Sequence, residues 1–140
     1  MTKPSQGKST LVSCVFPAWV LGKDPSKKIA AVSHNQDLAK NLHSNSRRIL
    51  ESNEFKAIFA RNKVTPLKNQ DMLYETRQGG SRSAVTMEAG MTGRGADILI
   101  FDDPMTPQDV LSTTEREKIN NMFGSTYCSR LNNRKEAAII

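Results

Sequence analysis

Apolar residues near the start of the chain recur at helical spacing. From Ser9 to Gly22 they fall on a rough helical period at Leu11, Val15, Trp19 and Val20. Pro17 should kink or shorten this helix, and Gly22 is placed as a stop. The pattern predicts a buried helix with Phe16 and Trp19 in the core.

The next segments alternate between strand and helix patterns. "IAAVS" at 29–33 is a short apolar run typical of a buried parallel strand, and a turn at His34-Asn35 follows it. A helix is predicted from Asn35, its N-cap, to about Ser52, with apolar residues on one side. A second short helix is predicted over "EFKAIFA", residues 54–60.

Strand patterns dominate the second half. Residues 71–78 and 83–89 flank Gly79-Gly80-Ser81 and predict a hairpin. "ADILIF" at 96–101 predicts a strand, Ser112 and Glu115 have capping-box spacing before a further helix, and "EAAII" at 136–140 begins another strand. We therefore expect an α/β fold, with a mostly parallel sheet flanked by helices and a hairpin insertion.

Composition narrows the class of protein. The chain has 140 residues, of which 37% are hydrophobic and 24% charged, as in one globular domain. Its apolar stretches are shorter than the roughly 20 residues of a membrane-spanning helix, so we expect a soluble, unsecreted protein with no membrane partner. Two distant cysteines and two histidines suggest neither a zinc site nor a disulfide framework, and a reducing compartment fits best.

The charge favours a polyanionic partner. A net charge of +6 suits phosphate contacts from Lys and Arg, although a basic but inert surface is an equal alternative. Four arginines are expected to be exposed and to meet either solvent or DNA: Arg47, Arg48, Arg77 and Arg82. His34 is expected at a strand end and His43 on a helix surface.

The stretch "KPSQGKSTL" carries the first chemical motif. Gly7, Lys8 and Ser9, followed by Thr10, match the end of a phosphate-binding loop, in which backbone N–H groups and Lys hold phosphates and Ser holds magnesium. The full motif has a glycine where this chain has Thr2, so a chance match is the alternative.

The second motif is a strand that ends in carboxylates. Ile98–Phe101 leads into Asp102 and Asp103, which fit a magnesium-binding Asp and an acid that activates the attacking water. An acidic turn is the alternative. Just upstream, the glycine-flanked Arg94 could neutralise charge in the transition state, or could be a solvated residue of a glycine-rich turn.

Together these stretches resemble the ATPase domain of the large terminase subunit, the DNA-packaging motor of tailed bacteriophages. The resemblance spans nearly the whole chain and is carried by "FPAW", "SHNQDLA" and "TGRGADILIFDDP" in this order, with "STTEREKINNMFGSTYCSRL" after them. It implies a fold of the P-loop NTPase type, with ATP as substrate and Mg²⁺ as cofactor. Residues 1–140 would be a partial ATPase domain that lacks its first strand and the C-terminal nuclease domain.

The resemblance also assigns roles by position. It makes Lys8 the phosphate lysine, Ser9 and Asp102 magnesium ligands, Asp103 the catalytic acid and Arg94 an arginine finger between subunits of a ring. Ser5 stands where many members have an Arg thought to sense nucleotide. Implied partners are double-stranded DNA, the portal protein and the small terminase subunit, in the cytoplasm of a bacterial host during virion assembly.

Two rival functions remain open from the sequence. One is another P-loop translocase or helicase that acts on nucleic acid. The other is an inactive prophage remnant that at most binds DNA through its basic surface.

Overall fold

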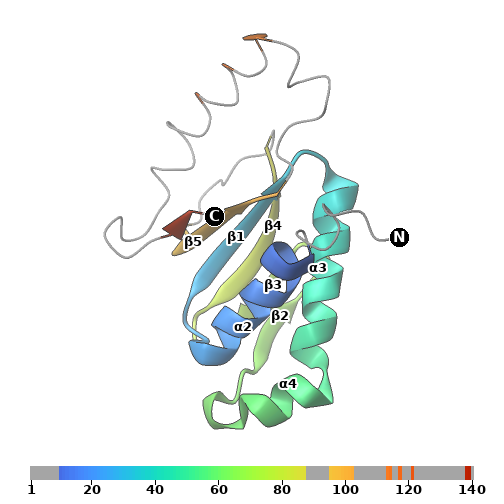
Figure 1. Cartoon of the computed structure of the whole chain (residues 1–140). Helices are drawn as coiled ribbons and strands as arrows, with labels where there is room; N and C mark the ends of the chain where they lie inside the picture. The colour runs from blue at the N-terminus through green and yellow to red at the C-terminus, as the bar shows by residue number, and fades with distance from the viewer. Residues whose placement is uncertain are drawn as a thin grey trace.

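The computed structural model describes residues 10–87 and 95–102, together with 113–114, 117, 121 and 138–139. It is a mixed α/β structure in which helices α2 and α3 lie on one face of a twisted sheet (Figure 1). In chain order the elements are η1 (Thr10–Val15), α2 (Phe16–Lys23), β1 (Lys28–Ser33), α3 (Gln36–Glu51), α4 (Asn53–Ile58), η2 (Ala60–Asn62), β2 (Pro66–Asn69), β3 (Leu73–Thr76), β4 (Ser81–Thr86), β5 (Ile98–Phe101) and β6 (Ala138–Ile139).

The sheet has the strand order β2-β3-β4-β1-β5-β6. β1 is parallel to both β4 and β5, and β5 is parallel to β6, whereas β3 is antiparallel to β4 and to β2. The expected mostly parallel sheet with a separate hairpin insertion is therefore corrected to a mixed sheet. The predicted hairpin forms as β3 and β4, but β4 pairs along its whole length with β1, so the hairpin extends the main sheet.

The hairpin turn depends on its glycines. Gly79 has a φ of 93°, in the region that favours glycine. A Cβ on Gly80 would overlap the carbonyl oxygen of Pro25, so only glycine fits where the turn passes the loop before β1.

The first predicted helix forms, but not as expected in detail. It begins as the wide π-helical segment η1 and continues as α2, with Pro17 in the first turn of α2. The helix does not stop at Gly22 but runs to Lys23. Gly22 allows the Phe59 ring to pack closely against the helix, since a Cβ at this position would lie 2.5 Å from the ring.

The two helices predicted between Asn35 and Ala60 form, as α3 and α4. The side chain of Asn35 caps α3 by accepting a hydrogen bond of 2.7 Å from the Leu38 amide. Ser52 caps α4 in the same way through the Phe55 amide. The capping-box residues Ser112 and Glu115 lie outside the described residues.

β1 is the central strand of the fold. Five of its six residues are buried, as the apolar run predicts. Ile29 and Ala31 belong to the core cluster that packs against α2 and α3, whereas Ala30 and Val32 belong to a second cluster with Leu99. Alternation along the strand therefore supplies apolar side chains to both faces of the sheet.

Three apolar residues on which the predicted buried helix was based are at the surface: Leu11, Val15 and Trp19. Trp19 is 50% exposed, next to the half-buried Phe16, whose ring stacks on it with centroids 6.2 Å apart. Within the described ranges, no helix has both the length and the apolar character that crossing a bilayer requires.

Candidate functional site

The structure describes only some of the predicted site residues. Gly7, Lys8, Ser9, Arg94 and Asp103 lie outside the described residues. Thr10 is the first residue of η1, and Asp102 follows directly after β5. The site is therefore built from Asp102 and from the helix that begins at Thr10.

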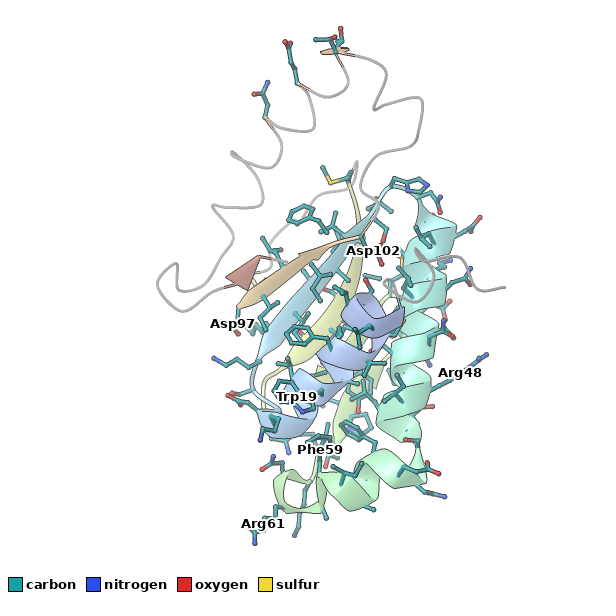
Figure 2. All side chains as sticks on the ribbon, in the orientation of Figure 1. Trp19, Arg48, Phe59, Arg61, Asp97 and Asp102 are labelled. Atoms are coloured by element: carbon teal, nitrogen blue, oxygen red, sulfur yellow. The ribbon has the colours of Figure 1, made fainter. Side chains whose placement is uncertain are left out.

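Asp102 lies at the end of the sheet where the parallel strands end. Its amide donates a 2.9 Å hydrogen bond to the carbonyl of Val32 near the end of β1, so β1 and β5 stay paired up to this point. Figure 2 shows its side chain at this end of the sheet, opposite the end that carries Arg61. Ligands commonly bind outside the carboxyl ends of strands in α/β sheets.

Ser13 joins this strand end to η1. Its hydroxyl donates a 2.6 Å hydrogen bond to Oδ2 of Asp102, across 89 residues of sequence. The segment that directly follows Gly7-Lys8-Ser9 is thus in direct contact with the carboxylate predicted to bind magnesium. The contact is made by Ser13, which lies beyond Thr10 and is not a residue of the predicted motif.

The backbone carbonyl of Ser13, in the π-helical segment η1, has a partner from the sheet. Nη2 of Arg82 on β4 donates to it. One residue is therefore held by its side chain to β5 and by its backbone to β4.

Arg82 was expected at the surface, and it is fully buried. The expectation is wrong because Arg82 alternates with its neighbours along β4, and its side chain lies on the same buried side as that of Ala84. Its other terminal nitrogen, Nη1, lies 3.0 Å from Nδ1 of His43 on α3. The guanidinium therefore links three elements: β4, η1 and α3.

His43 is likewise buried rather than on the helix surface. A guanidinium can only donate, so Nδ1 of His43 accepts, and Nε2 carries the proton that is shared with the carbonyl of Gln70 at 3.1 Å. Burial, and then the charge of Arg82, lowers the pKa of His43 to about 3. His43 is thus a neutral acceptor at physiological pH.

The charge of Arg82 is retained despite burial. Loss of hydration lowers its pKa to about 10, while the negative charge of Asp102 acts in the opposite direction. Its Nε has no hydrogen-bond partner among the described residues. Arg82 is therefore a buried cation at neutral pH, and it makes its hydrogen bonds through the terminal nitrogens Nη1 and Nη2.

Cys14 completes the attachment of η1. Its thiol donates to the carbonyl of Leu42 at 3.3 Å, and its own carbonyl accepts a 3.0 Å hydrogen bond from the hydroxyl of Ser46. Burial raises the pKa of the Cys14 thiol, so the sulfur is a weak donor and not a thiolate. Side-chain contacts thus hold the Ser13-Cys14 step against both the sheet and α3.

Asp102 is the carboxylate that the described residues offer to the predicted magnesium ion. No group of three His, Cys, Asp or Glu side chains that could hold a metal occurs in the described ranges. Mg²⁺, however, is commonly held by one or two carboxylates together with substrate phosphates and water. A single carboxylate beside the segment after a phosphate-binding motif meets that requirement.

The sequence predictions give no role to Ser13 and place both Arg82 and His43 at the surface. The predicted strand begins at residue 83, and extending its alternation back by one residue was the available signal, because Arg82 then shares a face with Ala84.

Comparison with protein-family models finds no match, and comparison with curated proteins finds none either. The resemblance to large terminase subunits thus rests on the motifs alone.

Proposed function

We propose that this chain is the nucleotide-binding part of an ATP-hydrolysing motor, of the kind that packages viral DNA. The observation that carries the proposal is the 2.6 Å hydrogen bond between Ser13 and Asp102. It joins the helix after the phosphate-binding motif to the strand that ends in Asp102-Asp103. A P-loop ATPase needs these two segments to be adjacent.

Each residue of the two motifs has a distinct task in the proposal. Lys8 neutralises oxygens of the β- and γ-phosphates, while the Ser9 hydroxyl and the Asp102 carboxylate would hold Mg²⁺. The metal, when bound, would offset negative charge on the phosphates. Asp103 orients and deprotonates the attacking water, and Arg94, supplied by a neighbouring subunit, stabilises charge in the transition state.

DNA as the translocated polymer is supported by charge at the other end of the molecule. Exposed cations there include Lys23, Lys28, Arg61, Lys63 and Arg77. Hydrogen bonds join their loops: Asn62 donates to the carbonyl of Gly22, and Gln78 donates to that of Lys63. Cations gathered in this way suit phosphate contacts. A ring of subunits, a portal protein and a small terminase subunit would complete the motor.

Isothermal calorimetry with a non-hydrolysable ATP analogue and Mg²⁺ tests the nucleotide site. The wild-type chain should bind, and Lys8→Ala should weaken binding at least tenfold because it removes the charge that faces the phosphates. Lys40→Ala, on α3, is the control for loss of one positive charge and should bind like the wild type. Equal signals from wild type and Lys8→Ala would remove the claim.

Fluorescence anisotropy with a short DNA duplex tests the basic end. Replacing Arg61 and Lys63 with Ser should weaken binding and reduce its dependence on salt, since two phosphate contacts are lost. Arg48→Ser, on the exposed side of α3 (Figure 2), should change neither by much. Identical effects of both changes would argue against a DNA surface at this end.

A further inference from the structure

Arg82 lies at the point where the hairpin strand, the first helix and α3 meet. In the sheet it stands opposite Ile29 of β1 and Tyr74 of β3. Both neighbours belong to the core cluster under the helices, so Arg82 projects into the same layer. A charged side chain in an apolar layer is costly to bury. Its contacts therefore call for an explanation beyond packing.

We propose that Arg82 is a positioning residue for the nucleotide site and that it acts through Ser13. Arg82 fixes the backbone of Ser13, and the Ser13 hydroxyl then orients the Asp102 carboxylate. The inference rests on the proposed function, since it concerns the same carboxylate. It adds a hairpin residue that neither the phosphate-binding motif nor the acidic strand contains.

Ser13 is held through its backbone by Arg82 and contacts Asp102 through its side chain. The Ser13 carbonyl, in the π-helical segment η1, accepts a hydrogen bond from a side chain of the sheet. Arg82 supplies that donor from β4, whose backbone is fixed by parallel pairing with β1. The carbonyl is thus tied to the centre of the sheet.

The guanidinium needs both of its anchors. A neutral His43 on α3 accepts from Nη1 while Nη2 holds Ser13, so the planar fork is fixed between two elements. The groups that face Arg82 are the His43 ring, the Ser13 carbonyl, the buried Cys14 and the charge of Asp102. A lysine could keep the charge, but its single nitrogen would not reproduce the fork.

A hydrogen bond to a metal-binding carboxylate affects the affinity of the metal. Groups that orient metal ligands typically change metal affinity by 10- to 100-fold when they are removed. Ser13 donates to Oδ2 of Asp102 and so restricts rotation of the carboxylate. Loss of Ser13 or displacement of its backbone should therefore raise the Mg²⁺ concentration needed for nucleotide binding.

The test measures binding of the non-hydrolysable ATP analogue to the full chain as Mg²⁺ is titrated. Ser13→Ala should raise the half-saturating Mg²⁺ concentration about tenfold, and Arg82→Lys should raise it severalfold. Because Arg82 acts through Ser13, the double variant should resemble Ser13→Ala alone. Ser46→Ala is the matched control: it removes a buried hydroxyl that bonds the adjacent Cys14 carbonyl and does not contact Asp102.

The outcomes separate the two proposals. Suppose that the wild type binds the analogue and that Ser13→Ala and Arg82→Lys have the same Mg²⁺ dependence as Ser46→Ala. The role of Arg82 is then refuted and the nucleotide site stands. The same conclusion follows if the effects of Ser13→Ala and Arg82→Lys simply add in the double variant. If the wild type binds no analogue at any Mg²⁺ concentration, both proposals fall. Should Arg82→Lys not fold, His43→Leu removes the second anchor and is expected to give the same severalfold increase, with an unchanged Mg²⁺ dependence refuting the role.

Discussion

The helix formed by η1 and α2 has two contrasting sides. On the buried side, Ser13 and Cys14 make directional polar contacts with β4, β5 and α3. On the outer side, Leu11, Val15 and Trp19 follow at intervals of four residues, and all three are exposed. The helix buries apolar residues such as Leu21, as an ordinary amphipathic helix does, but it also buries these polar contacts and leaves a second apolar stripe exposed.

The difference shows what fixes the helix at its start. Apolar packing is not directional, whereas hydrogen bonds from Arg82 and to Asp102 specify one rotation and one height of the helix. The outer stripe instead lines an apolar hollow of about 410 Å³ together with Val12 and Phe16. The polar side therefore determines where the segment after Gly7-Lys8-Ser9 lies.

Removal of the Arg82 side chain, which supports the buried side of the helix, should cause the largest fall in the free energy of unfolding. Arg82→Met leaves the Ser13 carbonyl and Nδ1 of His43 as unsatisfied buried acceptors, at a cost of about 3 kcal/mol in the free energy of unfolding. Urea denaturation measures it. Arg77→Met, at the exposed hairpin turn, is the matched control and should change stability by less than about 0.5 kcal/mol. Similar small losses in both variants would mean that the buried contacts do not hold the helix.

Acidification should weaken the same junction through His43. The folded-state pKa of about 3 lies below the ordinary value of 6.5, so the unfolded chain binds the proton first. The associated stability is fully present above about pH 6.5 and is lost as pH falls toward 3, at about 1.4 kcal/mol per pH unit. The free energy of unfolding should therefore fall by about 2 kcal/mol between pH 7 and pH 5 from this group.

The other histidine provides the comparison for this pH effect. His43→Gln should remove most of the loss between pH 7 and pH 5, measured by urea denaturation at each pH. His34→Gln, at the end of β1 where the side chain is half-exposed, should leave that loss in place. If His34→Gln rather than His43→Gln flattened the dependence, the neutral buried His43 would be refuted.

The outer side of the helix should be the least sensitive. Leu11 is 63% exposed, so Leu11→Ala should change the free energy of unfolding by no more than about 0.5 kcal/mol. Leu21 lies in the same helix and is fully buried. Leu21→Ala should therefore lower the free energy of unfolding by about 2 kcal/mol or more, as is typical when a core leucine is replaced by alanine. A large loss for Leu11→Ala would show that the exposed stripe supports the fold.

Local patterns in the sequence predicted much of the fold. The apolar run of β1, the Asn35 cap of α3 and the glycine turn between β3 and β4 are each specified by neighbouring residues, and each is confirmed. Pairing the two motifs predicted one site from the start of the chain and Asp102, but the contact seen with Asp102 comes from Ser13. The other predicted site residues Gly7, Lys8, Ser9, Arg94 and Asp103 lie outside the described part of the chain.

Local patterns did not predict the contacts among Arg82, Ser13 and His43. Arg82, Ser13 and His43 come from three separate elements, and their contacts exist only once the sheet and helices have assembled. A rule that places charge at the surface and tryptophan in the core assigns both Arg82 and Trp19 wrongly here. Gly22 was misread for a related reason, because its role depends on the distant Phe59 ring.

The central claim, that Asp102 belongs to a magnesium-nucleotide site, is tested most directly by two aspartates at opposite ends of β5. Asp97 precedes the strand and accepts a 2.8 Å hydrogen bond from the Lys28 amide, whereas Asp102 follows it and contacts Ser13. The measurement is the rise in melting temperature caused by Mg²⁺ and a non-hydrolysable ATP analogue. We predict that Asp102→Asn loses most of this rise and that Asp97→Asn keeps it; a full rise in Asp102→Asn would contradict the claim.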